Sequence, residues 1–425
     1  MTTSEHDFRV VIAEWMTNGP PAVMERDVSL TTDPKTVASV VGPRRAGKTS
    51  LLFRTMARLL SEGVPKQNIL YVDFEHPALV NVAAGDLDDM LKAFYELSRP
   101  DTRFPLYLFL DEVQNVKEYG RWFRKRLDAR YYISGSTSRL TSKSVAEELR
   151  GRSVDYVVYP LSFKEYLRFT GVEAGDAKAM LYSERRGVIL SALREYLRLG
   201  AYPAVALERD ETGRIRLLRS YFNSVLVRDL AVSSLPMAEA IAKFVVSNYA
   251  GALSLNRVSD YVRSLGYSVG KGKVQDVLKR GEESFIFLPV ELFVKSERRR
   301  KVNPKKYYIV DTGYSAALGY DFSIGRAMEN AVLLELKRRE REVYYWKEYG
   351  RSQGREVDFV ISKDFRAEEL VQVTYSSHGL REREVLALKK ARAAVGAKKT
   401  TVITWDYSDE QSGVGFTPLW YWLLD

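Results

Sequence analysis

The sequence predicts an α/β protein whose N-terminal part is built around a parallel β-sheet. Three observations support this fold class. A glycine-rich segment, 42–49, joins an apolar run to a helical one; a second apolar run, 106–110, ends in two carboxylates; and apolar runs alternate with helical patterns from residue 36 to residue 160. Strands that alternate with helices form parallel sheets, and ligands bind beyond the carboxyl ends of such strands.

Length and composition describe a water-soluble protein with several domains. The chain has 425 residues, too many for one hydrophobic core, so we expect roughly two to four domains. No apolar run approaches the roughly 18 residues that span a membrane, and the acidic stretch 4–7 lacks the basic character of a signal peptide. We therefore expect a cytoplasmic protein that does not associate with a membrane.

The chain contains no cysteine and three histidines. The lack of cysteine excludes disulfides, thiolate catalysis and cysteine-bound zinc, and the three histidines are too scattered in sequence to suggest a metal site. The formal net charge of +10 is compatible with a nucleic-acid partner, although a solvated basic surface gives the same balance.

The segment 42–49 matches the phosphate-binding pattern Gly-x4-Gly-Lys-Thr, between a predicted strand, 36–41, and a predicted helix, 51–60. In such a loop, backbone N–H groups and the helix N-terminus attract triphosphate oxygens. We expect Lys48 to reach the β- and γ-phosphates and Thr49 to hold Mg²⁺. The residues predicted to bind the nucleotide are Gly42, Pro43, Arg44, Arg45, Ala46, Gly47, Lys48, Thr49, Ser50 and Asp111.

An acidic pair follows the apolar strand 106–110. We expect Asp111 to bind Mg²⁺ through its water shell and Glu112 to orient and deprotonate the attacking water. A helix N-cap carboxylate is the alternative for Asp111 alone. An adjacent pair that follows a phosphate loop favours the catalytic interpretation.

Two further features of this part of the chain point to the same site. A strand at 131–136 would insert between the phosphate-loop strand and the acidic strand, and Ser134 or Ser136 at its end could contact the γ-phosphate; a plain turn serine is the alternative. Arg150 or Arg152 precedes the predicted fifth strand and could enter the site of a neighbouring subunit, where it would stabilise transition-state charge. The alternative is that both are ordinary surface arginines. An arginine that enters a neighbouring site requires a homo-oligomer.

A largely helical region, 161–250, follows the predicted sheet. Two short helices, 256–265 and 272–279, and two strands, 285–294 and 306–310, come next, and the two strands are joined by a basic turn. Two helices and a basic hairpin are typical of a winged helix that binds DNA, and protein binding is the alternative. The residues predicted to contact nucleic acid are Lys271, Lys273, Lys279, Arg280, Arg298, Arg299, Arg300 and Lys301.

The last part of the chain, 321–425, has the order helix, three strands, helix and strand. Glu329 on the first helix, Asp358 on the second strand and Gln372 on the third carry oxygens that could converge on a divalent metal. A nuclease also needs a cation near the phosphate, and Thr374 stands at the expected position. The predicted elements are helix 324–339, strands 342–348, 355–361 and 370–374, helix 382–394 and strand 400–405.

These motifs together resemble the archaeal and bacterial P-loop ATPases of the AAA+ class, signal-transduction type, whose C-terminal half is a domain of unknown function with a restriction-endonuclease-like end. The resemblance implies ATP and Mg²⁺ as cofactors, and it places Arg150 or Arg152 where AAA+ proteins often have an arginine finger. The segments that carry it are GPRRAGKTSLL from Gly42, LYLFLDEVQ from Leu106, YISGS from Tyr132, LRGR from Leu149, YPLSFKEYL from Tyr159, GAYPAV from Gly200, GRAMENAVLLEL from Gly325 and GREVDFVI from Gly354.

The nuclease-like end departs from its family at one position. In nucleases of the PD-(D/E)XK type the last pair of site residues reads Glu-x-Lys, whereas this chain reads Gln372-Val-Thr374. The loss of the lysine favours a fold that is kept for binding, with weak or absent cleavage.

The resemblance implies a P-loop AAA+ parallel-sheet domain with a helical lid, a winged helix and a restriction-endonuclease-like αβββαβ domain. We expect an Mg²⁺-dependent ATPase whose nucleotide state controls DNA binding. The alternatives are a nucleotide-dependent switch that binds a protein partner, and an active metal-dependent DNA nuclease that borrows a lysine from elsewhere. The predicted divisions are 1–35 (N-terminal helix and linker), 36–160 (ATPase core), 161–250 (lid), 251–320 (winged helix) and 321–425 (nuclease-like domain).

Overall fold

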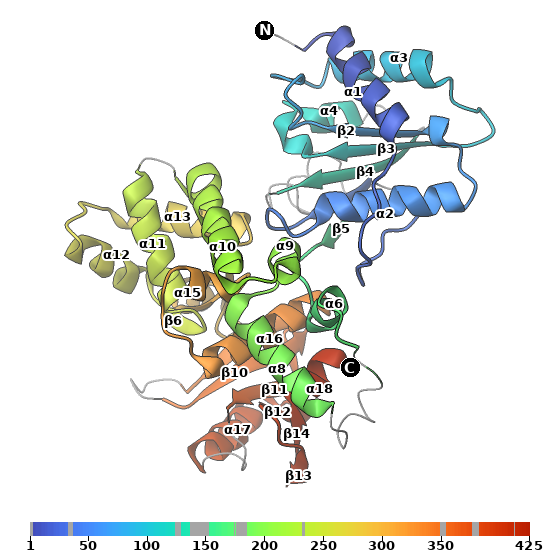
Figure 1. Ribbon diagram of the computed structural model, residues 1–425. Coiled ribbons are helices and arrows are strands. Elements are labelled where there is room, and N and C mark those ends of the chain that lie inside the picture. Colours follow the sequence, from blue (N-terminus) through green and yellow to red (C-terminus); the bar gives the residue numbers. More distant parts are fainter. Residues whose placement is uncertain are drawn as a thin grey trace. The chain divides into compact units, whose positions relative to one another are not determined.

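The computed structural model describes residues 3–32, 37–123, 129–136, 153–173, 175, 185–231, 234–348, 354–375, 382–411 and 413–425. The chain divides into two compact units, Met1–Val158 and Tyr159–Asp425. Figure 1 shows the elements of both units. Among the described residues, no helix is both long enough and apolar enough to cross a membrane.

The first unit contains a parallel sheet of five described strands with the order β2-β3-β4-β1-β5. This confirms the predicted parallel sheet and the insertion of β4 between the phosphate-loop strand β1 and the acidic strand β3. The elements are α1 (Glu5–Asn18), β1 (Val37–Val41), α2 (Lys48–Ser61), η1 (Lys66–Asn68), β2 (Ile69–Asp73), α3 (Leu87–Ser98), β3 (Leu106–Asp111), η2 (Val113–Asn115), α4 (Tyr119–Phe123), β4 (Ala129–Gly135) and β5 (Ser153–Val157).

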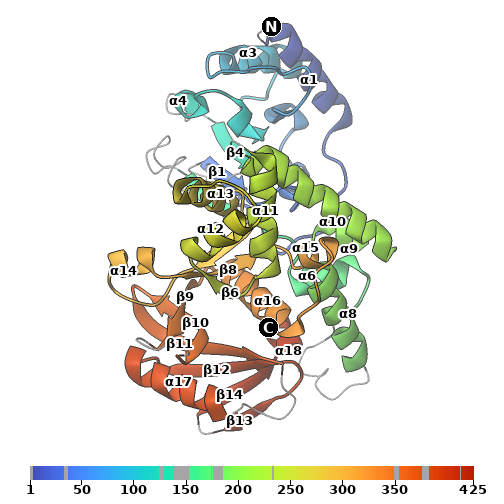
Figure 2. The same cartoon turned by 90° about the vertical axis from the view of Figure 1, so that its left-hand side faces the viewer.

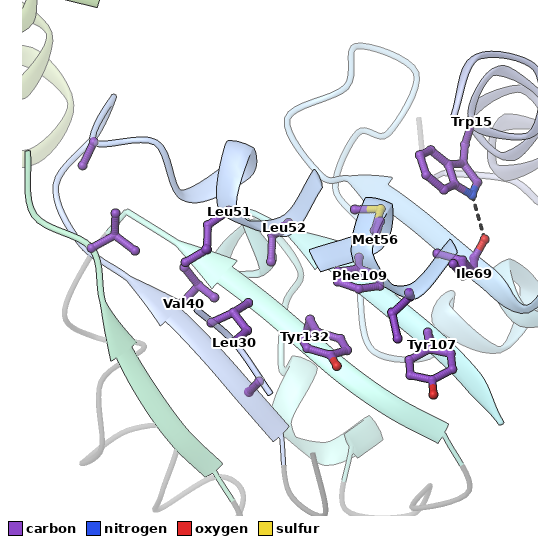
Figure 3. Packing of buried hydrophobic residues seen from close by; sticks show 14 residues of the cluster. Trp15, Leu30, Val40, Leu51, Leu52, Met56, Ile69, Tyr107, Phe109 and Tyr132 are labelled. Atoms are coloured by element: carbon purple, nitrogen blue, oxygen red, sulfur yellow. Dashed lines mark hydrogen bonds between the residues drawn. The ribbon is translucent and has the colours of Figure 1, made fainter. Parts of the chain in front are cut away.

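Helix α1 begins at a capping box, in which Ser4 N donates to Asp7 Oδ2 at 2.8 Å. Its Trp15 is buried, and the indole Nε1 donates to the backbone oxygen of Ile69 at 2.7 Å. An indole that satisfies its only donor in this way can be buried without cost to hydrogen bonding. The contact fixes α1 to strand β2 (Figure 3).

Helix α2 covers the sheet because its apolar residues recur with helical spacing. Leu52 and Met56 are fully buried against the sheet residues Phe109 and Tyr132, whose rings stack with centroids 4.3 Å apart (Figure 3). Since α2 starts at the last residues of the phosphate loop, this packing also fixes the position of the loop.

The second unit begins with helices, as predicted for residues 161–250. The described elements are α6 (Phe163–Phe169), α8 (Arg186–Leu199), α9 (Pro203–Leu207), α10 (Glu211–Val225), the π-helical turn η4 (Leu226–Leu230) and α11 (Leu235–Ser247). Residues 200–202 separate α8 from α9. Gly200 has a φ of +80°, and a Cβ there would lie 1.7 Å from Asp311 Oδ1, so only glycine fits.

A small antiparallel sheet with the order β6-β8-β7 follows. The left-handed φ of +61° at Phe285 interrupts the extended backbone, so β7 begins after residue 285, where the predicted strand 285–294 starts, and it already ends at Val290. The elements are β6 (Gly251–Leu253), α12 (Leu255–Ser264), α13 (Lys271–Glu283), β7 (Phe287–Val290), α14 (Glu297–Val302), β8 (Lys305–Ile309) and α15 (Gly313–Ala317).

The basic stretch 295–301 is not the hairpin turn that the sequence predicted, because it forms helix α14. Ser296 caps this helix by accepting from the backbone N–H of Arg299. Glu297 and Lys301 then form an i,i+4 ion pair at 2.7 Å. A capping serine followed by strong helix formers outweighs the turn that charge alone suggested.

The C-terminal part forms a mixed sheet of six described strands with the order β13-β14-β12-β11-β10-β9. Helix α17 packs on one face through Ala387, Leu388 and Ala391, whereas α16 contacts strand β11 near Val371 on the other face (Figure 2). The predicted helix–three strands–helix–strand order is observed, and β13, β14 and α18 extend it. The elements are α16 (Ile324–Arg338), β9 (Glu342–Lys347), β10 (Glu356–Lys363), β11 (Arg366–Thr374), α17 (Glu382–Val395), β12 (Lys399–Thr404), β13 (Asp409–Gln411), β14 (Val414–Pro418) and α18 (Leu419–Leu424).

Candidate functional site

The loop 42–49 connects β1 to α2, and its backbone requires small residues. Gly42 has a φ of +147°, and a Cβ there would lie 2.2 Å from the backbone oxygen of Val158. Gly47, with a φ of +100°, is the N-cap of α2. The first N–H groups of α2 have no partner within the helix and therefore point towards the loop as donors. A glycine turn that leads into a helix N-terminus offers the N–H donors that bind triphosphate oxygens, so the residues of this loop fit such a ligand.

Lys48 lies at the centre of this loop. Its side chain is buried, and Nζ donates to the backbone oxygens of Gly42 at 3.1 Å and Pro43 at 3.0 Å. The same Nζ is 4.0 Å from a carboxylate oxygen of Glu112. The predicted phosphate-binding lysine and the predicted catalytic glutamate therefore lie together.

Asp111 lies at the carboxyl end of β3 and accepts four hydrogen bonds. Its Oδ2 accepts from Thr49 Oγ1 at 2.6 Å and from Tyr71 OH at 3.1 Å. Its Oδ1 accepts from Ser134 Oγ and from the backbone N–H of Glu112. Burial raises the pKa of Asp111, although the hydrogen bonds from Ser134 and Thr49 oppose this rise. The donors fix the carboxylate beside the residue predicted to hold Mg²⁺.

Glu112 has a left-handed φ of +51°, which is rare for a residue with a side chain. Its backbone N–H donates to Ser134 Oγ at 3.1 Å, and its carboxylate accepts from Gln114 Nε2. The unusual backbone turns the chain sharply at the end of β3, and the side chain lies near Lys48. Strain of this kind often occurs at functional sites.

The two serines of β4 have different surroundings. The hydroxyl of Ser134 is engaged with Asp111 and Glu112. Ser136 is fully buried, and its Oγ has no hydrogen-bond partner in the described part of the chain. A buried hydroxyl without a partner is available to a ligand.

The remaining predicted nucleotide residues lie around the loop. Arg44 contacts Glu75 at 3.4 Å, and Arg45 is exposed with a φ of +66°. The backbone oxygen of Ala46 accepts from Arg26 at 2.7 Å, which the sequence did not indicate. Pro43 is buried and Ser50 is half-buried at the start of α2; the predicted arginines Arg150 and Arg152 fall outside the described residues.

Tyr71 and Asp73 on β2 are site residues that sequence inspection missed. Asp73 is the register partner of Asp111 in the parallel β2–β3 pair, and burial raises the pKa of Asp73. Burial also raises the pKa of Tyr71, so its hydroxyl stays a donor towards Asp111. The available signal was the period-2 spacing of these two polar side chains on a strand next to β3.

The predicted metal residues of the C-terminal part also come together, but around a cation of the protein. Lys306 Nζ on β8 is 2.6 Å from Glu329, 3.0 Å from Glu356 and 3.2 Å from Asp358. The amide nitrogen of Gln372 donates to Asp358 Oδ2 at 2.7 Å, whereas its Oε1 is buried and has no hydrogen-bond partner among the described residues. No group of three or more acidic, histidine or cysteine side chains suited to a metal occurs in the described ranges.

Burial and charge act in opposite directions in this cluster. Burial by itself would lower the pKa of Lys306, but the carboxylates led by Glu329 outweigh it and raise this pKa well above the ordinary value. Burial raises the pKa of Glu329 to about 7, and Asp358 beside it adds to the rise. The ammonium is therefore charged and occupies the space between the carboxylates.

The predicted nucleic-acid residues fall into two groups. Most of them are exposed on α13 and α14, with Arg280 half-buried. Arg300 differs because its guanidinium stacks 4.3 Å from the ring centroid of Phe365 and lies 3.6 Å from Glu291. Arg300 is therefore half-buried on helix α14 and not part of a turn, and its contact with nucleic acid stays a prediction.

Comparison with known proteins yields two family matches and two relatives. Residues 34–167 match the family described as an AAA domain, and residues 190–325 match a domain of unknown function. An uncharacterized protein of Methanocaldococcus jannaschii is 26% identical over 95% of this chain and 91% of its own length. An uncharacterized protein of Haemophilus influenzae is 27% identical over 79% of this chain and 80% of its own length.

Among solved structures, a Walker-type ATPase of Pyrococcus abyssi has a TM-score of 0.42 and 12% identity, covering 74% of this chain and 95% of that chain. Cdc6p from Pyrobaculum aerophilum has a TM-score of 0.27 and 12% identity, and the match covers 67% of this chain and 86% of that chain. The phosphate loop, the parallel sheet and the family match over residues 34–167 together support a P-loop ATPase domain of the AAA class in the N-terminal unit.

Proposed function

We propose that the N-terminal unit binds ATP with Mg²⁺ and hydrolyses it. The observation that carries this proposal is the meeting of Lys48, Asp111 and Glu112 at the carboxyl ends of parallel strands. A cradle of backbone donors, a cation and two carboxylates in different surroundings is the set of groups that phosphoryl transfer to water needs.

Each residue of this set has a separate task. Lys48 would neutralise charge on the β- and γ-phosphates as it leaves the loop carbonyls that it now contacts. Thr49 and Asp111 would hold Mg²⁺, which when bound would withdraw charge from the phosphate oxygens. Glu112 would orient the attacking water and take up its proton. Ser136, whose hydroxyl has no hydrogen-bond partner in the described ranges, is the better of the two serines for contacting the γ-phosphate.

Phosphate release by the purified full chain tests this proposal. Hydrolysis should require Mg²⁺ and stop when the cation is chelated, because the phosphate charge is then not neutralised. Lys48→Ala should abolish both nucleotide binding and hydrolysis, since it removes the ammonium group of the loop. Lys66→Ala is a matched control, because Lys66 donates to the backbone oxygen of Met16 outside the loop. An inactive wild-type chain, with or without DNA, would contradict hydrolysis.

We propose that the C-terminal unit binds DNA under the control of the nucleotide state. Strand β6, helices α12 and α13, and strands β7 and β8, which are joined through α14 and pair in the sheet order β6-β8-β7, support a winged helix over 251–320. Exposed cations lie on α13, which would be its second helix, and on α14. We assign the preceding residues, 161–250, as the lid and the following residues, 321–425, as a nuclease-like fold. An assembly of several subunits, with an arginine supplied by a neighbour, belongs to the same proposal.

The DNA affinity of the full chain should fall steeply with salt concentration, because cations that contact phosphates release counterions. Arg298→Ala with Arg299→Ala should weaken binding and make its salt dependence shallower, by roughly one unit of slope per lost contact. Arg209→Ala with Arg216→Ala removes the same charge from exposed positions on other elements and should change neither. Fluorescence anisotropy with a DNA duplex measures the affinity and its salt dependence, once with ATP and once with ADP. DNA binding that does not depend on salt would favour the switch hypothesis. The same holds if the chain does not bind DNA but captures a protein partner.

An active nuclease is the second candidate function, because Lys306 brings an ammonium to Glu329 and Asp358 from outside the 372–374 motif. The same contacts of Lys306 argue against DNA cleavage. A divalent cation would have to displace an ammonium that is held by three carboxylates at 2.6–3.2 Å. We therefore propose that the nuclease-like end binds DNA without cutting it.

A further inference from the structure

The surroundings of Asp111 extend beyond the residues of the phosphate-binding and acidic motifs. Two of its four donors, Thr49 and the backbone N–H of Glu112, belong to those motifs. A third, Ser134, is on the neighbouring strand β4. The fourth is the hydroxyl of Tyr71 on β2, 3.1 Å from Oδ2. No sequence motif requires a tyrosine at this position.

The hydroxyl reaches Asp111 because of strand register. Tyr71 pairs with Phe109 in the parallel β2–β3 ladder, and Asp111 lies two residues further along the same strand. Residues two apart on a strand share a face, so Tyr71, Phe109 and Asp111 all point to the side covered by α2. The long tyrosine side chain spans the diagonal between the strands.

The ring of Tyr71 is fixed from two sides. Its centroid is 5.0 Å from that of Phe53 on α2 and 5.7 Å from that of Trp15 on α1, in tilted arrangements that aromatic pairs favour. Trp15 is itself fixed by its hydrogen bond to the Ile69 oxygen. Two helices and strand β2 therefore determine where the hydroxyl lies.

We propose that Tyr71 is a positioning residue for Mg²⁺·ATP, whose hydroxyl holds the Asp111 carboxylate in the orientation that receives the cation. The inference rests on the proposed function of this site. Groups that hydrogen-bond to a metal-binding carboxylate orient it, and their loss typically costs about 10–100-fold in metal affinity or activity. With Thr49 as the other donor on Oδ2, Tyr71 keeps the carboxylate from rotating when the threonine oxygen is offered to the cation.

Tyr71→Phe keeps the ring between Trp15 and Phe53 and removes only the hydroxyl. We expect the Mg²⁺ concentration for half-maximal hydrolysis to rise about 10-fold and kcat to fall, with KM for ATP at saturating Mg²⁺ nearly unchanged. Binding of a fluorescent ATP analogue in the presence of a chelator should match the wild type. When Mg²⁺ is added, the analogue should bind more tightly, but this increase in affinity should need a higher Mg²⁺ concentration than in the wild type.

Tyr132→Phe is the matched control. Tyr132 is a buried tyrosine of the same sheet whose hydroxyl donates to the Thr31 oxygen at 2.7 Å, away from Asp111. If it shifts the Mg²⁺ dependence as much as Tyr71→Phe does, the effect is general loosening of the core and the proposal is wrong. Wild-type Mg²⁺ dependence in Tyr71→Phe also overturns it. A wild type that binds the analogue without hydrolysing it contradicts the proposed hydrolysis, whereas a Mg²⁺ shift in the binding titration of Tyr71→Phe still supports the positioning role.

Discussion

Glu112→Gln is expected to leave ATP bound to the protein and to slow its hydrolysis by about 10²–10⁴-fold, the usual contribution of a general base. The amide keeps the size of the side chain but cannot take a proton from water. Nucleotide binding should persist, because Lys48 and the N-terminus of α2 are unchanged. Single-turnover phosphate release and chromatography of the bound nucleotide measure the two effects separately.

Glu118→Gln is a suitable control for this substitution. Glu118 lies six positions further along the same unit, is exposed, and pairs with Arg121 at 2.8 Å. Exposed pairs of this kind contribute little to stability. Its loss should leave hydrolysis unchanged. Turnover by Glu112→Gln at the wild-type rate would refute the assignment of the base.

Lys306→Met is expected to destabilise the C-terminal unit by about 3–5 kcal/mol, the usual result of removing one partner from a buried ion cluster. Methionine fills most of the volume but leaves Glu329, Glu356 and Asp358 without a cation among them. Denaturant unfolding followed by circular dichroism measures the change. Lys305→Met is the control, since this neighbouring lysine makes looser pairs at 3.5 and 3.9 Å and is partly exposed, so its loss should cost under about 1 kcal/mol.

The destabilisation should depend on pH. Burial raises the pKa of Glu329 to about 7 from an ordinary 4.5, so the folded state holds this proton more tightly than the unfolded chain. The contribution of Glu329 to stability is therefore lost as the pH rises from about 4.5 to about 7. Without the ammonium this pKa rises further, so Lys306→Met should lose more stability relative to the wild type at pH 8 than at pH 5. An equal loss at both pH values would contradict the cluster as described.

The same variants decide between binding and cleavage in the nuclease-like end. With Mg²⁺ or Mn²⁺, the wild type should leave linear and branched DNA intact, because Lys306 occupies the space that a divalent cation would need. The three freed carboxylates of Lys306→Met are ligands that hard cations prefer, so Mn²⁺ should raise its melting temperature and leave that of the wild type unchanged. Cleavage by the wild type that disappears in Asp358→Ala would establish the nuclease instead.

The local sequence pattern was sufficient for the N-terminal unit. The glycine spacing of the phosphate loop, the apolar strand before Asp111 and the alternation of strands and helices predicted the parallel sheet and the strand order around β1. These features are readable because close contacts in a P-loop sheet are made by residues at fixed places in short motifs. The order of elements in the C-terminal part was also predicted from periodicity.

Other parts of the prediction failed for a physical reason. The stretch 295–301 was predicted to be a turn because of its charge, but a capping serine and an i,i+4 pair make it helical. Arg300 belongs to the packing around Phe365 and not to an exposed turn. In both cases the observed structure depends on a neighbour that composition does not reveal.

The sequence by itself determined the phosphate loop, the acidic pair and the succession of helices and strands, since each depends on residues close together in the chain. Only the tertiary structure placed Tyr71 beside Asp111 and Lys306 beside the carboxylates of Glu329 and Asp358. It also showed that the hydroxyl of Ser136 has no hydrogen-bond partner among the described residues. The Tyr71–Asp111 and Lys306–Asp358 contacts join residues that are 40 and 52 positions apart. They depend on strand register and on which side chains share a buried volume, and a linear pattern contains neither.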